Sequence, residues 1–482
     1  MIRPAALAFL AAVALYLPTT RFGFVEDDQP LVLTNPAAHD VGAALRAYDQ
    51  PFWPRSVSSG MWRPITVLSY AVDWSLSGGG LGWLHFTGTL WHGLACALVV
   101  LVLARWLPPA GALAAGLVFA VHPVHVEAVA NVVGRAELMA AAGYAAALLC
   151  AVRAERGPRY LVGVALGAAF AMGSKEIAVT LPATVLLVHA ARRSDLRMAW
   201  RPAVAATVPI LAYFVVQGLV GIRTFYAGGL AVGLEDVGFF ARTWAMVRLS
   251  LEWWRLFLFP AHLSADYSPG ELTVSTALTL WHVLGLLVWI GVGVLAWRTR
   301  RTIPGIATGL AWTVVTISPV ANIVFPTEFL IAERTLYLAS FGVVFALACA
   351  ASAIRSPRAR LAVVAIAVVA GAARTIARIP AWHDDETHYQ ALKREAPRSY
   401  RTLWLEGRDE FAAGRWGSGE RLILQSIAFA PELTGPRYEL ALYYMKAKMW
   451  QPAIRQLEAS IAIDSVFTPA RDALRIARDS AR

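Results

Sequence analysis

The feature that most constrains this chain is a series of apolar runs, each close to the length needed to cross a bilayer. A transmembrane helix needs about 20 mostly apolar residues. Only 16% of the 482 residues are charged and 57% are hydrophobic, whereas soluble domains carry about 25% charged residues. We therefore predict an all-α, polytopic membrane protein with about 11 transmembrane helices. The expected spans lie near residues 4–20, 83–106, 109–127, 136–152, 159–173, 176–191, 201–220, 279–297, 303–319, 335–353 and 361–379.

Basic residues in the short turns predict the orientation, because cytoplasmic loops are enriched in Lys and Arg. This distribution places the N-terminus in the cytoplasm and, with eleven spans, the C-terminus on the outer side of the cell inner (plasma) membrane. The same arginines account for the net charge of +11, so we expect contact with anionic membrane lipids and not with nucleic acid. The basic turns lie near residues 105, 153–159, 192–201, 298–301 and 355–360.

The stretch 240–260 decides whether the chain has eleven or twelve spans. It holds Arg242, Arg248, Glu252 and Arg255 among aromatic residues, which suits a helix lying in the membrane interface better than one crossing it. Counted as a twelfth span, it would move the basic turn at 298–301 to the outside. We expect a surface helix within a second long outer loop at about 221–279.

The composition changes after Pro380 to that of a soluble helical segment. Within it, Trp382, Trp416 and Trp450 recur at one constant interval. This interval equals the period of the tetratricopeptide repeat, about 34 residues, in which each repeat is a helix–turn–helix. We therefore divide the chain into a transmembrane domain at 1–380 and a periplasmic α-solenoid of tetratricopeptide repeats at 381–482.

The acidic triplet Glu26, Asp27 and Asp28 follows the first apolar run and opens an outer loop at about 21–82. Adjacent carboxylates repel one another when ionised, so one of them can hold a raised pKa suited to general-base catalysis. The alternative is a solvated loop that caps a helix. Further along this loop, Arg63 either binds a phosphate or anchors the loop to lipid headgroups.

The second outer turn contains the sequence HPVHVE, with His122, His125 and Glu127. Two histidines and a carboxylate are ligands for zinc or another transition metal. Pro123 tends to break a helix here, and the sequence fixes no fourth ligand. We therefore favour hydrogen bonds to a phosphate, to substrate or to the acidic loop, and expect no required metal or other cofactor.

Three pairs of opposite charge lie where helices re-enter the membrane, and they are Arg135–Glu137, Lys175–Glu176 and Glu333–Arg334. One interpretation is that the members of each pair neutralise one another. The other is that Arg135, Lys175 and Arg334 face a lipid-linked phosphate while the carboxylates orient them. All these groups gather at one predicted membrane face, as in an enzyme that works at the boundary between lipid and water.

The order of these motifs resembles a known family. FVEDDQPLVLTNP, MWRPITVLSY, FAVHPVHVEAVANVVGRAELMAA, SKE, NIVFPTEFLIAERTLYLAS and AWHDDE lead into the repeats. This series is similar to the transmembrane and TPR-repeat-containing protein O-mannosyltransferases of the C-type (GT-C) glycosyltransferase superfamily. The resemblance implies a polyprenyl-phosphate-linked sugar donor, a Ser or Thr acceptor on the non-cytoplasmic side, and a catalytic acidic pair, here Asp27 and Asp28. The Ala- and Arg-rich composition suggests a bacterial chain, for which undecaprenyl phosphate would be the lipid.

Three functions follow from this reading. The first is a membrane glycosyltransferase in which Asp27 or Asp28 deprotonates an acceptor hydroxyl, the basic residues bind the leaving phosphate, and the repeats capture a protein acceptor. The second is an enzyme of the same fold that glycosylates a glycolipid or a cell-surface polysaccharide. The third is a membrane scaffold that uses its repeats to assemble a complex, without catalysis.

Overall fold

The computed structural model describes the chain except for residues 54–59, 192–195, 223–230, 235–236 and 325. The described residues form helices and connecting loops, with no β-strand among them. This confirms the all-α fold, and each of the eleven apolar runs contains a helix. These helices are α1 (Ile2–Tyr16), α4 (Leu81–Leu103), α5 (Pro109–Ala120), α7 (Arg135–Ala151), α8 (Pro158–Ser174), α9 (Leu181–Ala191), α10 (Leu196–Leu219), α12 (Leu280–Thr299), α13 (Pro304–Ile317), α14 (Ser340–Ser352) and α15 (Pro357–Arg378).

Several of these helices are suited to cross a membrane. Among the described residues, five helical stretches are long and apolar enough by length and composition. A sixth is added if α5 and the segment Pro123–Ala130 form one span, although the two are bent by 51°. The bend lies at Pro123, which lacks an N–H and leaves His122 in an extended conformation. A multi-pass membrane protein is therefore supported, while the count of eleven spans and the orientation remain predictions.

Helix α7 lies at the centre of the helical body and is buried along nearly its whole length. It packs against α8 through small residues that let the two backbones approach closely. A Cβ atom at Gly143 would lie 3.0 Å from the backbone nitrogen of Ala171, and one at Gly167 would lie 2.9 Å from the Gly143 carbonyl oxygen. The first turn of α7 carries Arg135 and Glu137, so both side chains start from a rigid support.

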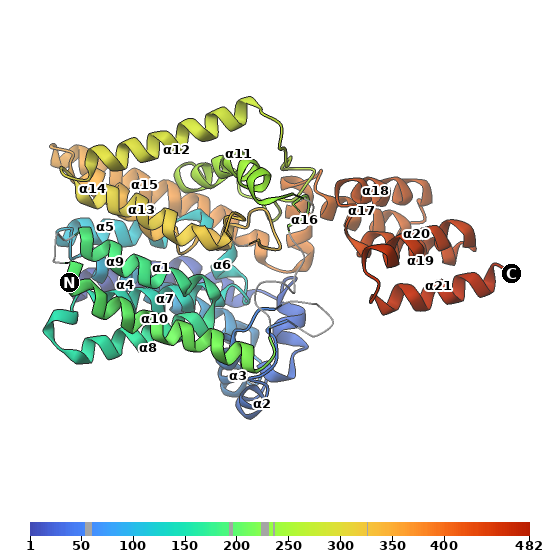
Figure 1. Cartoon of the computed structure of the whole chain (residues 1–482), viewed down its shortest axis with the longest axis horizontal. Coiled ribbons are helices and arrows are strands. Elements are labelled where there is room, and N and C mark those ends of the chain that lie inside the picture. The colour runs from blue at the N-terminus through green and yellow to red at the C-terminus, as the bar shows by residue number, and fades with distance from the viewer. Residues whose placement is uncertain (54–59, 192–195, 223–230, 235–236, 325) are drawn as a thin grey trace.

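The stretch at 240–260 forms helix α11 (Phe239–Leu258), which packs against α12 (Figure 1). Its buried face includes Leu249, Trp253 and Trp254. Its position in a membrane interface stays a prediction. Part of the expected loop at 221–279 lies outside the described residues, namely 223–230 and 235–236, and so does 192–195 in one of the basic turns.

Short elements gather at the end of the body nearest the C-terminal helices (Figure 1). Helix α3 begins at Pro64, and proline suits the first position of a helix because its missing N–H would have no helical partner there. Between these elements run the loops that carry most of the predicted site residues. The short elements are η1 (Leu17–Arg21), η2 (Gln29–Leu33), η3 (Pro36–Ala38), α2 (Val41–Arg46), α3 (Pro64–Ser77), η4 (Pro123–His125), α6 (Val126–Ala130), η6 (Glu176–Thr180) and η8 (Glu333–Leu336).

The C-terminal segment protrudes from this end of the body, with α16 (Asp385–Glu395) at the junction (Figure 1). It continues as α17 (Tyr400–Ala412), α18 (Trp416–Phe429), α19 (Thr434–Lys446), α20 (Trp450–Ile463) and α21 (Thr468–Ser480). Helices α17, α19 and α21 begin at equal intervals along the chain, and the starts of α18 and α20 are separated by the same interval. At the crossing of α17 and α18, a Cβ at Gly407 would lie 2.6 Å from the Ile423 side chain. The helical pairs and their period are those expected, while the assignment as tetratricopeptide repeats remains a prediction.

Candidate functional site

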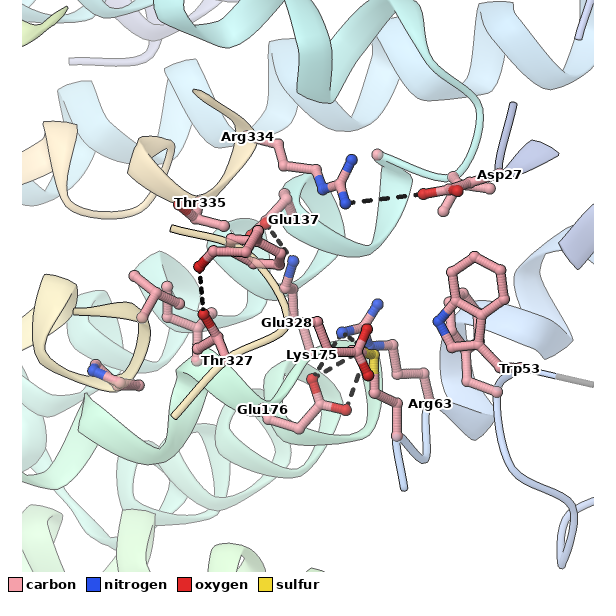
Figure 2. Close-up of a pocket in the computed structure, with 18 of the residues that line it drawn as sticks. Asp27, Trp53, Arg63, Glu137, Lys175, Glu176, Thr327, Glu328, Arg334 and Thr335 are labelled. Atoms are coloured by element: carbon pink, nitrogen blue, oxygen red, sulfur yellow. Dashed lines mark hydrogen bonds and ion pairs between the residues drawn. The ribbon is translucent and has the colours of Figure 1, made fainter. Parts of the chain in front are cut away.

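A cavity of about 210 Å³ lies at this end of the body, between the acidic loop that follows α1 and the segments that precede α3, α7, η6 and η8. Its walls come from the loop carrying Asp27, residues 52–53 and 60–63 before α3, the turns before α7 and η6, and residues 319–320 and 326–335 (Figure 2). Charged side chains lie on the same walls as a large apolar surface. The charged residues among its lining are Asp27, Arg63, Glu137, Lys175, Glu176, Glu328 and Arg334.

Asp27 is the member of the acidic triplet that lines the cavity. Its Oδ2 atom lies 3.7 Å from Nη2 of Arg334, and the two side chains point toward one another (Figure 2). Burial raises the pKa of Asp27 above its ordinary value, although the Arg334 guanidinium lowers it. A partly buried carboxylate with a raised pKa is a stronger base than an ordinary aspartate, which suits proton abstraction from a hydroxyl.

Asp28 is fully buried and is not among the residues lining the cavity. Its carboxylate accepts hydrogen bonds from the backbone N–H groups of Val25 at 3.1 Å, Val132 at 3.4 Å and Val133 at 2.8 Å. Burial raises the pKa of Asp28 to about 7, against the effect of these three donors. Asp28 therefore joins the acidic loop to the turn between α6 and α7, and the two aspartates have different surroundings.

Arg334 is held in place by Glu127. Glu127 accepts a hydrogen bond from Arg334 Nη1 at 2.8 Å and another from the Arg334 backbone N–H at 2.9 Å. Burial opposes the charge of Arg334, but the carboxylates of Glu127 and Asp27 outweigh it and raise the pKa of the guanidinium. Arg334 is thus a permanent positive charge whose position is fixed on one side by Glu127.

Arg63 and Lys175 are the other two cations on the cavity wall, and each is paired with a carboxylate. Arg63 Nε lies 3.1 Å and Nη2 3.0 Å from Oε2 of Glu176, and Lys175 Nζ contacts Glu137. Figure 2 shows both pairs facing the cavity. All three cations therefore have defined positions before any ligand binds.

The proposed neutralisation between sequence neighbours is wrong. Lys175 pairs with Glu137 and not with Glu176, and Arg334 pairs with Glu127 and Asp27 and not with Glu333. Side chains one or two residues apart on a helical turn project in different directions, so they do not face one another. Each ion pair instead joins segments that are distant in the sequence.

Arg135 does not reach the cavity. Its Nη1 atom lies 2.5 Å from Oδ2 of Asp73, and Nη2 donates to Oγ1 of Thr87 at 2.7 Å. The guanidinium also lies over the ring of Tyr70, 4.9 Å from its centroid. These contacts join α3, α4 and α7, so Arg135 stabilises the wall of the site and does not face a ligand in it.

The two histidines and Glu333 are also packed inside the body, away from the cavity. His122 Nε2 lies 3.0 Å from the Phe257 carbonyl oxygen, and His125 Nε2 lies 2.9 Å from Oγ of Ser340. Glu333 accepts hydrogen bonds from the Tyr267 hydroxyl and the Ser264 backbone N–H, both at 2.7 Å. Within the described part of the chain, no three His, Cys, Asp or Glu side chains are grouped as metal ligands.

Sequence reasoning missed part of the site. Trp53, Thr327 and Glu328 line the cavity but were not among the predicted site residues (Figure 2). Trp53 lies in the segment before α3, and the other two lie in the segment before η8. The sequence NIVFPTEFL could have indicated Glu328, because this carboxylate follows a proline and precedes the Glu333–Arg334 pair.

Comparison with known proteins points to one family. The chain is 39% identical to the protein O-mannosyl-transferase Tmtc2 of Drosophila melanogaster over 185 residues, which are 35% of this chain and 20% of that relative. It is 27% identical to the protein O-mannosyl-transferase F38B6.6 of Caenorhabditis elegans over 361 residues, covering 70% of this chain and 49% of the relative. It is also 27% identical to the protein O-mannosyl-transferase TMTC4 of Mus musculus over 385 residues, covering 66% and 51%.

The resemblance to the transmembrane and TPR-repeat-containing O-mannosyltransferases is confirmed. In the longer alignments the chain spans about half of the relative's length, and in the first only a fifth. No family model matches the chain. No solved structure matches it either. Each of these three relatives is named a protein O-mannosyl-transferase.

Proposed function

We propose that this chain is a membrane glycosyltransferase that moves a sugar from a polyprenyl phosphate to a Ser or Thr hydroxyl of a protein. The observation that carries the proposal is the position of Asp27, a partly buried carboxylate in a cavity that also holds Arg63, Lys175 and Arg334. A general base and a set of cations are the two requirements of the reaction. The names of the relatives favour mannose as the sugar and protein as the acceptor.

In the proposed reaction, Asp27 takes the proton of the acceptor hydroxyl as the oxygen attacks the anomeric carbon of the sugar. The bond between that carbon and the phosphate oxygen breaks, and its electron pair leaves with the phosphate. A new glycosidic bond forms in one displacement, which inverts the anomeric carbon. Arg334, Lys175 and Arg63 would stabilise the charge that develops on the leaving polyprenyl phosphate.

The apolar side of the cavity suits the lipid portion of such a donor. Lipid-linked sugars join a charged phosphate to a hydrocarbon chain, so their site needs cations next to apolar side chains. We propose that the reaction needs no cofactor, because the departing monophosphate could be neutralised by basic side chains alone. We place the reaction on the non-cytoplasmic face. The apolar lining includes Leu31, Phe52, Met61, Ile177, Val179 and Phe214.

The proposal is tested by incubating the purified full-length protein with a panel of polyprenyl-phosphate sugars and serine-containing peptides. Mass spectrometry should detect a peptide enlarged by one hexose and an equal amount of free polyprenyl phosphate. Transfer to a glycolipid or polysaccharide with no peptide product would favour the second hypothesis. If the protein consumes no donor with any acceptor, the enzymatic proposal is wrong and the scaffold remains.

A further inference from the structure

A second cavity, of about 680 Å³, lies between the acidic loop and the first helices of the C-terminal segment. Its walls come from Glu26 and Asp27 on one side and from α16, α17 and α19 on the other. Asp27 lines this cavity as well as the one that holds the three cations, and it is the residue their linings share. The two cavities therefore meet at the carboxylate to which we assign the general base.

The second cavity differs from the first in composition. The first has a large apolar share, as a lipid-linked donor requires, whereas charged and aromatic side chains dominate the second. The second also lies against helices outside the apolar body, and inner faces of stacked helical pairs form extended binding surfaces in other repeat proteins. These features suit a polar, extended polypeptide rather than a lipid.

On the walls of the second cavity, carboxylates outnumber arginines. Two arginines line the cavity, Arg401 paired at 3.0 Å with Glu26, itself a lining residue, and Arg408 paired at 2.9 Å with Glu439. Five carboxylates line it, so the surface is acidic overall. These carboxylates are Glu26, Asp27, Asp385, Glu386 and Asp409.

Aromatic rings lie among these carboxylates. Tyr389, Trp404 and Tyr443 all line the cavity, and Tyr389 donates a hydrogen bond from its hydroxyl to Asp409 at 2.7 Å. Lys393 lies over the Tyr389 ring, 4.9 Å from its centroid. Aromatic faces beside carboxylates attract Lys and Arg side chains through both cation–π and ion-pair interactions.

We infer that the second cavity binds an extended, basic segment of the acceptor polypeptide and leads its Ser or Thr hydroxyl to Asp27. Lysine or arginine residues of the acceptor, a few positions from the hydroxyl, contact the acidic and aromatic walls. The delivery to Asp27 rests on the proposed function, whereas the binding of a basic peptide does not. This inference assigns an acceptor class and a location that the names of the relatives do not give.

Peptide binding to the full-length protein in detergent tests the inference without a sugar donor. One fluorescent peptide has a single serine flanked by lysines, and its partner carries glutamates at the same positions. Fluorescence anisotropy should show the lysine peptide binding about tenfold more tightly, the effect of a few exposed ion pairs, and salt should weaken it. Equal binding of the two peptides, or a preference for glutamate, would overturn the inference.

A pair of variants locates the binding. Glu386→Gln with Asp409→Asn removes two charges from the cavity and keeps the side-chain shapes, and the amide that replaces the Asp409 carboxylate retains an oxygen for the Tyr389 hydroxyl. The control, Glu458→Gln with Asp472→Asn, removes two charges from α20 and α21, which do not line the cavity. We expect affinity for the lysine peptide to fall about fivefold in the first protein only. An equal fall in both, or in neither, would contradict the location.

Sugar transfer measured on the same proteins separates this inference from the proposed function. If the lysine peptide binds through the cavity but receives no sugar from any donor, the transferase proposal fails and the binding site stands. If both peptides are glycosylated equally well, and the cavity variants leave the KM for each peptide unchanged, the transferase proposal stands and the cavity inference is wrong.

Discussion

The Arg401 guanidinium in α17 lies 3.0 Å from the carboxylate of Glu26, the residue immediately before Asp27. Glu26 has a φ of 49°, in the left-handed region that residues other than glycine seldom occupy. Its backbone N–H also donates to Oδ1 of Asp385 at 2.8 Å, and the Gly23 N–H donates to the His383 carbonyl oxygen at 2.8 Å. The C-terminal segment therefore holds the acidic loop in a conformation that the loop alone would not favour.

Loss of this contact should lower transfer even to an acceptor too small to reach the second cavity. The test acceptor is a single serine whose amino and carboxyl groups are blocked. We predict that Glu26→Ala lowers the transfer rate to this acceptor by about tenfold, because a small displacement of Asp27 slows the reaction. The control is Glu271→Ala, which removes a different contact to the C-terminal segment, the pair of Glu271 with Arg398. Equal rates in the two variants, measured with a radiolabelled donor, would count against this role of Glu26.

Deletion of the C-terminal segment would also break the contacts that hold the acidic loop. Removing residues 383–482 would remove the partners of Gly23 and Glu26 together with the C-terminal helices. We therefore expect the truncated protein to lose activity toward protein, lipid and small acceptors alike. Such a deletion does not distinguish acceptor recognition by the C-terminal segment from its support of the acidic loop.

Asp28 should matter for stability more than for chemistry. An asparagine in its place would turn one acceptor oxygen into an NH₂ group facing a backbone N–H, because both oxygens of Asp28 now accept. We predict that Asp28→Asn lowers the free energy of unfolding by about 1–3 kcal/mol, the cost of leaving buried polar groups unpaired. Thermal unfolding in detergent measures this, and Asp27→Asn, whose side chain borders the cavity, should change the melting temperature little.

Activity should depend on pH through Asp27. The ordinary pKa of an aspartate is about 3.9, and burial raises that of Asp27. Because the base must be ionised, the transfer rate should fall as pH is lowered, with its midpoint above the ordinary value. Removing the positive charge of Arg334 raises the pKa of Asp27 further, so Arg334→Gln should move the midpoint to higher pH.

The matched control for this shift is Arg334→Lys, which keeps the charge and should move the midpoint less. Both variants lower the rate itself, so profiles are compared after normalising each to its own maximum. A midpoint that moves to lower pH in Arg334→Gln, or that does not move in either variant, would mean that Asp27 is not the titrating base.

The helical framework and the region of the site follow from the sequence. The apolar runs predict the helices because a long apolar helix is the simplest structure that satisfies its own backbone in a membrane. The spacing of Trp416 and Trp450 predicts the paired helices, which begin at those residues. The prediction that charged turns cluster at one end also identified Asp27, Arg63, Lys175 and Arg334, all of which line one cavity.

The directions of individual side chains did not follow from the sequence. Asp27 and Asp28 are neighbours in a loop without a regular period, so nothing local indicates which of them faces the cavity. Arg135 lies close to Glu137 in the sequence, yet its partner is Asp73, on helix α3 much earlier in the chain. Tertiary packing determines these side-chain directions, and the composition of the chain does not indicate them. Glu328 was missed for the same reason, because its loop reaches the site only through the fold.

The central claim is that the carboxylate of Asp27 removes the proton from the acceptor hydroxyl. The most direct test compares initial rates of sugar transfer to a serine peptide for the wild type, Asp27→Asn and Asp28→Asn, each normalised to folded protein. We predict that Asp27→Asn lowers the rate by about 10²- to 10⁴-fold, as expected for loss of a general base, while its melting temperature stays that of the wild type. An Asp27→Asn protein that transfers sugar at nearly the wild-type rate would contradict the account.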